Sequence, residues 1–443
     1  MNALLKALVI VFLSACASAH GWPQAKTPAP VIALRAAHLI DGKTDSVLNN
    51  AVVVVEGEKI TSVGAALAIP SGAQVIDLGD ATLLPGFIDA HTHLLSEMNG
   101  ENLSLQDVEM LRIVTTQSTA KRALLGAKLA REDLQAGITT VRDLGNSGVN
   151  GDVALHDAIE SGWLPGPRMV ASTRALAPQG GQFGRLIPEA QSVIELEYVT
   201  IRGSESARQA VRQALYDGAR CIKVIVNGTP ANVTLDEMKA IVEEAHLSKV
   251  KVAAHAIGDP AERVAIEAGV DSVEHAYFIS DDLLSQMAQK HIFLVPTDGT
   301  LQTFEDMSFG TRQPTAAERA STEKAFKQFV DAEQDRLRRA IKLGVPIASG
   351  SDMYLTIPGK DRGQASLLVF EAYGEAGMAP MQIIRAATRG GAELLGLQDR
   401  IGTLESGKLA DIIAVPGDPT KDLKALERAK FVMKGGVIFK AAQ

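Results

Sequence analysis

The chain has 443 residues, a length that predicts two units, or one large barrel with a smaller domain beside it. Hydrophobic residues make up 46% and charged residues 22%, which excludes a chain that is mostly disordered. The formal net charge is -8 without a basic cluster, so no nucleic acid is expected as a partner. The two cysteines, Cys16 and Cys221, are too few for a cysteine-rich metal site.

Residues 1–19 are predicted to be a signal peptide. Lys6 supplies a positive start, residues 7–13 form a short apolar run, and residues 17–19 (Ala-Ser-Ala) fit a cleavage site. Residues 13–16 (Leu-Ser-Ala-Cys) also resemble a lipobox, so the alternative is a lipoprotein leader that is cleaved before Cys16 and leaves a lipid anchor there. Both patterns predict an exported protein, either periplasmic or secreted, or held at a membrane as a lipoprotein. Residues 20–30 contain three prolines and are expected to be a linker.

Both ends of the remaining chain carry β patterns. Residues 51–55 form a run rich in β-branched side chains before a turn, which is typical of a hairpin strand. Residues 411–415 and 430–433 have the same character near the other end. We therefore expect one small β-sandwich domain assembled from both termini, with residues 31–84 as its N-terminal part and residues 399–443 as its C-terminal part.

Residues 85–398 alternate between strand-like and helix-like segments. Eight alternations over about 300 residues are typical of a (β/α)8 TIM barrel, which is the α/β architecture we predict here. A doubly wound open sheet alternates in the same way, but polar residues recur at the ends of several strands and favour the barrel. The predicted strands are residues 86–93, 139–144, 168–172, 219–226, 250–256, 271–277, 292–297 and 346–352.

Side chains at the strand ends suggest a metal site. His91 and His93 share one face of the first strand, because residues two apart on a strand point the same way. Lys223 is predicted to face the barrel interior, where an unpaired ammonium is costly and needs neutralisation. His255, His275 and Asp352 end later strands, at the face where barrels carry their active sites. A single buried histidine is more often structural, but four imidazoles with a carboxylate form a donor set that zinc prefers.

These segments resemble the amidohydrolase superfamily. Residues 84–93 (Leu-Pro-Gly-Phe-Ile-Asp-Ala-His-Thr-His) are similar to its first-strand signature, and residues 137–143 are similar to its second-strand segment. Residues 273–275 (Val-Glu-His) and 348–352 (Ala-Ser-Gly-Ser-Asp) match later segments. The resemblance covers nearly the whole mature chain. Within the superfamily, the chain looks most similar to the branch with imidazolonepropionases and Xaa-Pro dipeptidase-like enzymes.

The resemblance implies two divalent metal ions, with zinc expected, and a role for each ligand. His91, His93 and Asp352 would bind the first ion, and His255 and His275 the second. Lys223 would be carbamylated (N6-carboxylysine) and bridge both ions, which also removes its buried positive charge. A hydroxide held between the ions would attack the substrate, and Asp352 would carry the proton to the leaving nitrogen. A single-metal deaminase is disfavoured, because the lysine replaces that design.

The substrate pocket departs from the pattern of many relatives. Gln182 stands where they carry a histidine after the third strand, and Ile257 stands where many have a second histidine. The weak candidates for substrate binding are Gln182, Asn227, Tyr277 and Arg185, and the candidates for holding a substrate carboxylate also include Lys360 and Arg362. Each of these taken alone is more often a structural or solvated residue.

The expected function is metal-dependent hydrolysis of an amide bond in a small molecule, with a dipeptide or an N-acyl amino acid as the preferred substrate. One alternative is the opening of a cyclic amide, as in imidazolonepropionases, and another is hydrolysis of a xenobiotic or mycotoxin amide. An alternative of a different class is a metal-binding protein without catalysis. Barrels of this kind often form dimers or larger rings, so a homo-oligomer is expected.

Overall fold

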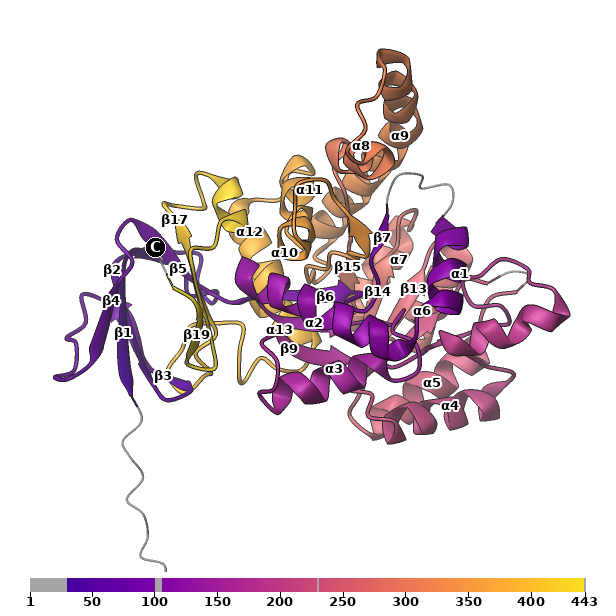
Figure 1. The fold of residues 1–443 in the computed structure, drawn as a ribbon, viewed down its shortest axis with the longest axis horizontal. Coiled ribbons are helices and arrows are strands. Elements are labelled where there is room, and N and C mark those ends of the chain that lie inside the picture. Colours follow the sequence, from indigo (N-terminus) through magenta and orange to yellow (C-terminus); the bar gives the residue numbers. More distant parts are fainter. Residues whose placement is uncertain (1–29, 100–105, 229–230, 442–443) are drawn as a thin grey trace, which may run out of the picture.

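The computed structural model describes residues 30–99, 106–228 and 231–441, which form a small β domain beside a larger α/β barrel (Figure 1). The predicted signal peptide, Cys16 and the predicted linker up to residue 29 lie outside the described residues, as do the last two residues of the C-terminal part. Of the described helices, none is long and apolar enough to cross a membrane.

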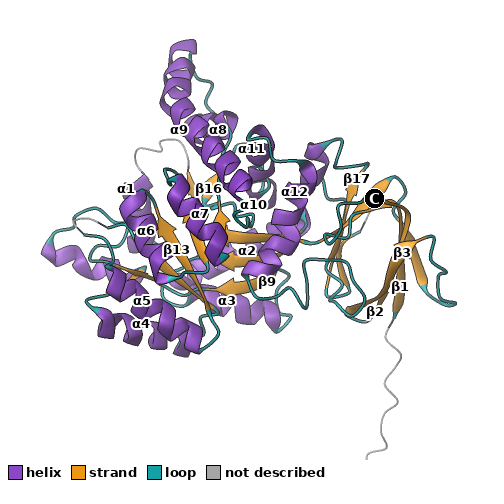
Figure 2. Cartoon of the chain, turned by 180° about the vertical axis from the view of Figure 1, so that it is seen from behind, coloured by secondary structure: helices purple, strands orange, loops and turns teal. Residues whose placement is uncertain are grey.

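The β domain is built from both ends of the chain, which confirms that part of the predicted fold. Its strands form one hydrogen-bonded sheet in the order β19-β18-β17-β5-β1-β2-β3, with β4 paired to β1. The two ends meet where β5 pairs antiparallel with β17, for example at Leu84 and Ile413. Apolar side chains from both halves of the sheet share one core. The sheet lies to one side of the barrel (Figure 2). The strands are β1 (Val31–Leu39), β2 (Leu48–Glu56), β3 (Lys59–Ala65), β4 (Gln74–Asp77), β5 (Ala81–Pro85), β17 (Ile412–Pro416), β18 (Phe431–Lys434) and β19 (Val437–Lys440).

The barrel strands are parallel and follow one another around the ring in chain order. They are β6 (Phe87–Thr92), β8 (Ile138–Asp143), β9 (Arg168–Ala171), β10 (Ala175–Ala177), β12 (Cys221–Ile225), β13 (Lys251–Ala256), β14 (Ser272–His275) and β15 (Phe293–Val295). The third position is divided, because β9 pairs with β8 whereas β10 pairs with β12. Thr173, with φ of +62°, lies between the two pieces.

The eighth barrel position is occupied by an irregular segment and not by a regular strand. Isolated parallel bridges join Leu294 to Ile347 on one side and Thr92 to Met353 on the other, and these close the ring. Gly350 permits the close approach, since a Cβ there would come within 2.4 Å of Val295 and 2.8 Å of the His91 Cβ. Residues 346–352 therefore occupy the predicted place of the eighth strand, but they do not form the regular hydrogen bonds of a strand.

Helices surround the barrel, and their ends carry the expected capping residues. Ser118 caps α2, and Gly137 ends it with φ of +104°, a conformation that glycine adopts without strain. Thr234 and Glu237 form a capping box on α5. The helices of the outer ring are α2 (Thr119–Ala136), α3 (Gly151–Glu160), α4 (Ser204–Tyr216), α5 (Leu235–Leu247), α6 (Asp259–Ala268), α7 (Asp281–Lys290), α9 (Ala316–Leu343), α11 (Val369–Glu375) and α12 (Pro380–Arg385).

The loops at the barrel mouth carry further elements. Helices α8 and α9 rise together above the barrel (Figure 1). The remaining short elements of the chain, at the mouth and elsewhere, are α1 (Gln106–Thr116), α8 (Leu301–Phe309), α10 (Arg362–Ser366), α13 (Gly391–Leu394), η2 (Pro188–Leu196), η3 (Ala386–Gly390), η4 (Leu423–Glu427), β7 (Met98–Asn99), β11 (Tyr198–Thr200) and β16 (Leu355–Thr356).

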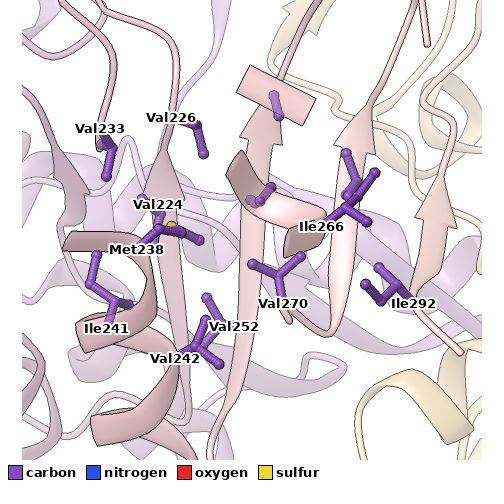
Figure 3. Close-up of a cluster of buried hydrophobic side chains, with 14 of the residues drawn as sticks. Val224, Val226, Val233, Met238, Ile241, Val242, Val252, Ile266, Val270 and Ile292 are labelled. Carbon is purple, nitrogen blue, oxygen red and sulfur yellow. The ribbon is translucent and has the colours of Figure 1, made fainter. Parts of the chain in front are cut away.

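The main core lies between the strands and the outer helices (Figure 3). Val224 and Val252 point outward from β12 and β13 and pack with Met238 and Ile241 of α5. Because side chains alternate along a strand, this outward packing turns Lys223 and His255 toward the barrel interior. The apolar face of the strands thus determines which polar side chains reach the site.

Candidate active site

One cavity of about 260 Å³ at the carboxyl ends of the barrel strands gathers the predicted metal ligands. The strands β6, β12, β13 and β14 and the irregular eighth segment each contribute to it. The predicted ligands that line the cavity are His91, His93, Lys223, His255, His275 and Asp352.

The side chains at the centre of the cavity lie within a few ångströms of one another. Oδ1 of Asp352 is 3.0 Å from Nε2 of His93 and 3.4 Å from Nε2 of His91. Nζ of Lys223 is 3.4 Å from the same nitrogen of His91. His91, His275 and Asp352 each offer one ligand atom, and these atoms lie within 4.8 Å of one another. His255 packs against His275, with ring centroids 4.6 Å apart.

Hydrogen bonds at Nδ1 hold three of the imidazoles in their orientation. Nδ1 of His91 is 2.8 Å from Oε2 of Glu274, and Nδ1 of His93 is 2.9 Å from the carbonyl oxygen of Gly145. Nδ1 of His275 is 2.8 Å from Oγ1 of Thr297. Partners of this kind orient imidazole ligands and fix which ring nitrogen is free. In His91 and His93 they leave Nε2 directed at Asp352.

His275 reaches the cavity because of an unusual backbone conformation. Along β14 the side chain of Glu274 faces the interior, while Val273 packs in the outer core. Strict alternation would therefore turn His275 outward as well. The strand ends at His275 with φ of +68°, and this left-handed conformation brings the imidazole into the cavity. Asp352 also has a positive φ, at +49°. Strain at such positions often accompanies a functional site.

The ionisation of these groups suits cation binding. Burial, followed by the neighbouring charge of Lys223, lowers the pKa of His255 to about 3. Burial likewise holds the pKa values of His91 and His275 well below the usual range for histidine. Burial acts to raise the pKa of Asp352, but His91 and His93 together with Lys223 hold it below its usual value. Neutral imidazoles and an ionised carboxylate are the forms that coordinate metals.

The donor set therefore fits a divalent metal centre. Four imidazoles and one carboxylate suit zinc and similar ions. Lys223 is 2% exposed, and burial lowers its pKa to about 8. Within the described ranges, no carboxylate lies within ion-pairing distance of Nζ of Lys223. Burial of this amine favours its neutral form, whereas the charges of Glu274 and Asp352 act to keep it protonated.

Two buried residues that support the site carry no role in the sequence-based prediction. Glu274 accepts hydrogen bonds from Arg142, at 2.9 Å, and from Ser272, in addition to that of His91. Arg142 is itself fully buried and also donates to the carbonyl oxygen of Ala90. A signal was available in the sequence, because the motif Val-Glu-His places a carboxylate directly before a predicted ligand.

Asp89 also acts on the site through the backbone of the eighth segment. Oδ2 of Asp89 accepts a hydrogen bond from Oγ of Ser351 at 2.6 Å, and Oδ1 accepts from the amide of Ser351 at 3.0 Å. Burial, the largest influence, raises the pKa of Asp89 to about 6. The amide of Asp352 in turn donates to the carbonyl oxygen of His91 at 2.7 Å. These bonds attach the segment that carries Asp352 to the first strand.

The weaker substrate-binding candidates separate into two groups. Gln182 and Tyr277 line the cavity, and Gln182 accepts a hydrogen bond from the hydroxyl of Tyr198 at 3.2 Å. Asn227 lies outside the cavity lining, where it exchanges two hydrogen bonds of 2.7 Å with the backbone of Ile257. Arg185 is exposed and also lies outside the lining.

The two further candidates for holding a carboxylate do not reach the cavity. Arg362 is buried and donates to the carbonyl oxygens of His93, Ser96 and Met353. Its guanidinium therefore joins the segment that follows β6 to the eighth barrel segment. Lys360 is half-buried and is not part of the cavity lining.

The fold and the site together define a class of protein. Barrels carry their active sites at the carboxyl ends of the strands, and here that end holds four imidazoles beside a carboxylate and a buried lysine. This is the arrangement of a metal-dependent hydrolase.

Comparison with known proteins gives the family. Residues 82–439 match the model of the amidohydrolase family, and the chain belongs to this family. It is 30% identical to ochratoxinase from Aspergillus niger, over 93% of this chain and 87% of that protein. It is 25% identical to imidazolonepropionase from Bdellovibrio bacteriovorus, over 84% of each chain.

The solved structures agree with this assignment. A Xaa-Pro dipeptidase with bound methionine in the active site is 31% identical and has a TM-score of 0.76, over 93% of this chain and 100% of that one. The structure of the A. niger ochratoxinase has a TM-score of 0.77 at 27% identity, over 93% of this chain and 96% of that one. The chain is thus a hydrolase that acts on amide carbon–nitrogen bonds of small molecules, in a family that typically uses two metals.

Proposed function

We propose that this hydrolase uses two zinc ions to cleave an N-acyl amino acid or a dipeptide that carries a free carboxylate. The observation that carries the proposal is the group of six potential ligands in one cavity, four of them imidazoles. The likeness to ochratoxinase and to a Xaa-Pro dipeptidase supports an amide substrate. Methionine in the active site of the latter protein supports an amino acid as a product.

His91, His93 and Asp352 would hold one zinc ion, and His255 and His275 would hold the other. Lys223, carbamylated on Nζ, would contribute to both, and this modification would convert a buried ammonium into an anion. The bound ions would polarise the substrate carbonyl and lower the pKa of water, so that a nucleophile is available at neutral pH. The ring nitrogens fixed by Glu274 and Gly145 keep His91 and His93 in position for this task.

Asp352 is the side chain best placed to move a proton. Its Oδ1 lies near both His91 and His93, and its carboxylate also lines a second cavity beside the first. In the proposed reaction Asp352 accepts the proton of the attacking water and delivers it to the leaving nitrogen. Tyr277 lines both cavities, and its hydroxyl lies 3.4 Å from Oγ1 of Thr297. Tyr277 would therefore contact the substrate.

Hydrolysis of two other kinds of amide is a secondary candidate for the function. The match to ochratoxinase over 93% of the chain favours the amide of a xenobiotic or mycotoxin. The weaker match to imidazolonepropionase favours a cyclic amide. A metal-binding protein without catalysis is disfavoured, because Asp352 is available as a proton shuttle.

The test is amine release from a panel of dipeptides and N-acyl amino acids, using the zinc-loaded protein without residues 1–19. Hydrolysis of a subset of the panel would support the proposal, and the preferred amino acid would identify the substrate. If the protein binds two metal ions per chain and hydrolyses none of the panel, the dipeptide and N-acyl proposal fails. The same protein would then be assayed with cyclic amides and xenobiotic amides.

We also propose that the protein is exported, on the basis of the pattern in residues 1–19. Fractionation of cells that express the full chain and its Cys16→Ala variant separates the two versions of this proposal. Loss of membrane association in the variant would support the lipid anchor, and unchanged fractionation would support soluble export. We propose a homo-oligomer as well, which sedimentation would test.

A further inference from the structure

We infer that a second cavity beside the metal centre, here called the aromatic pocket, binds an uncharged aromatic or bulky aliphatic side chain on the amine side of the scissile amide. The aromatic pocket is the space of about 270 Å³ between α8 and α9 on one side and the residues around Met353 and Leu368 on the other. The inference rests on the proposed function and assigns the substrate group that the protein selects.

The wall of the aromatic pocket is a continuous row of rings that leads to the metal centre. The rings of Phe326 and Phe304 are stacked, with centroids 4.8 Å apart and planes at 6°. Phe329 lies edge-on to Phe304 at 5.7 Å and edge-on to Tyr277 at 4.8 Å. Tyr277 in turn is 5.5 Å from His275. A substrate could therefore place one of its groups against these rings while its amide lies at the proposed metal site.

The aromatic pocket opens onto the reacting centre and is not an isolated void. Tyr277, Asp352 and Tyr354 line both this pocket and the cavity of the predicted ligands. Asp352 thus stands at the junction of the two spaces. In the proposed reaction Asp352 gives a proton to the leaving nitrogen. The amine half of the substrate therefore lies on the same side of the site as Asp352. The side chain of the leaving amino acid then points into the aromatic pocket.

The chemistry and size of the pocket determine the kind of group that fits. Phe304, Phe326 and Phe329 are only half-buried, so an apolar ligand would remove more of their surface from water. No lysine, arginine or histidine among the described residues lines the pocket, while Asp298 does, which disfavours a carboxylate there. Asp298 is already paired with the buried Arg336. A cavity of about 150 Å³ holds a benzene molecule, so this one has room for a phenyl or indole group.

The experiment compares two substrate series on the zinc-loaded protein. The amine-side series is N-acetyl-L-alanine, N-acetyl-L-leucine and N-acetyl-L-phenylalanine. The acyl-side series is N-acetyl-L-alanine and N-benzoyl-L-alanine. We expect kcat/KM to rise at least about tenfold from alanine to phenylalanine, since even a single methylene in an apolar pocket is worth about tenfold or more. No preference within the amine-side series, or a preference confined to the acyl-side series, would overturn the inference.

Two variants locate the preference in the aromatic pocket. Phe326→Ala shortens the ring row, and Met307→Trp fills the pocket without removing a ring. Both are expected to lower the phenylalanine-to-alanine ratio about tenfold and to change hydrolysis of N-acetyl-L-alanine much less. The matched control is Phe278→Ala, because Phe278 is 60% exposed and does not line the pocket. Equal losses on both substrates in both variants would contradict a specificity role.

Binding of the free amino acids separates this inference from the proposed function. We expect L-phenylalanine to bind the zinc-loaded protein at least about tenfold more tightly than L-alanine in calorimetry, with the difference lost in Phe326→Ala. If the whole amide panel is inert but this binding difference is found, the proposed function fails and the aromatic pocket stands. If amides are hydrolysed and neither rate nor binding favours phenylalanine, the proposed function stands and the inference fails.

Discussion

His91 donates a hydrogen bond from Nδ1 to Oε2 of Glu274, 2.8 Å away, and both side chains are almost fully buried. The other oxygen of Glu274 is taken by Arg142 and Ser272. The carboxylate therefore holds the proton of His91 on Nδ1 and keeps Nε2 free to face Asp352 and Lys223.

The Glu274→Gln variant tests this role. The amide oxygen would keep the bonds to Arg142 and Ser272, which turns the amide NH2 group toward Nδ1 of His91. That nitrogen must then accept, so the proton moves to Nε2 and blocks the proposed metal ligand. We expect zinc affinity, measured by competition with a chelator, to fall about 10- to 100-fold. Glu323→Gln, on the exposed surface of α9, is the control. Unchanged affinity in Glu274→Gln would show that Glu274 does not position His91.

Removal of the buried amine tests the proposed carbamate. Lys223→Ala is expected to reduce bound zinc to at most one ion per chain and to lower kcat/KM about 100-fold or more. After growth with ¹³C-labelled bicarbonate, a carbamate signal in the ¹³C spectrum should be present in the unaltered protein and absent in Lys223→Ala. The matched control is Lys239→Ala, which removes an exposed lysine of α5. Two tightly bound ions in Lys223→Ala would contradict the bridging role.

Asp352→Asn tests the proton shuttle. The substitution preserves the size of the side chain and its place at the junction of the two cavities, but the amide cannot accept a proton. We expect the fold to persist, as judged by circular dichroism, while turnover of the best substrate falls nearly to zero. Asp282→Asn, at an exposed position of α7, should leave turnover unchanged. If Asp352→Asn retains more than about a tenth of the activity, general acid–base catalysis by this residue is wrong.

Local sequence patterns are enough to predict several features of the fold and the site. Alternation along β12 predicts that Lys223 faces the barrel interior, and in the structure Lys223 lines the cavity while its neighbour Val224 packs in the outer core. The fold class and the family were also predicted correctly, because a barrel of alternating segments and its strand-end motifs are local features.

Features that depend on contacts between distant segments were not predicted. The function of Glu274 depends on His91, which lies 183 positions earlier in the chain. His275 was predicted as a site residue from its motif and does line the cavity, but the positive φ that brings it there does not follow from alternation. In the sequence Phe304 and Phe326 look like the apolar residues of any helix, and only the packing of α8 on α9 places their rings beside the candidate metal site.

A buried acidic pair, Glu333 and Asp298, lies at the aromatic pocket. Glu333 of α9 is 1% exposed, and the charged and titratable groups that face it are Asp298, Arg336 and Tyr277. Burial and then the charge of Asp298 raise the pKa of Glu333 well above its usual value, although Arg336 acts in the opposite direction. The folded protein thus keeps a proton that the unfolded chain releases above about pH 4.5. The contribution of Glu333 to stability is therefore full at low pH and is lost as the pH rises toward the raised pKa.

Glu333→Gln removes this titration and retains the shape of the side chain. We expect the free energy of unfolding of the variant, relative to that of the unaltered protein, to become more positive between pH 5 and pH 8, so that the variant gains relative stability, because only the unaltered protein must bury an ionising carboxyl group. Urea unfolding at several pH values within that window measures the difference. Glu323→Gln, on the exposed surface of the same helix, should show no such trend. A stability difference that is constant with pH would mean that Glu333 titrates alike in the folded and unfolded chains.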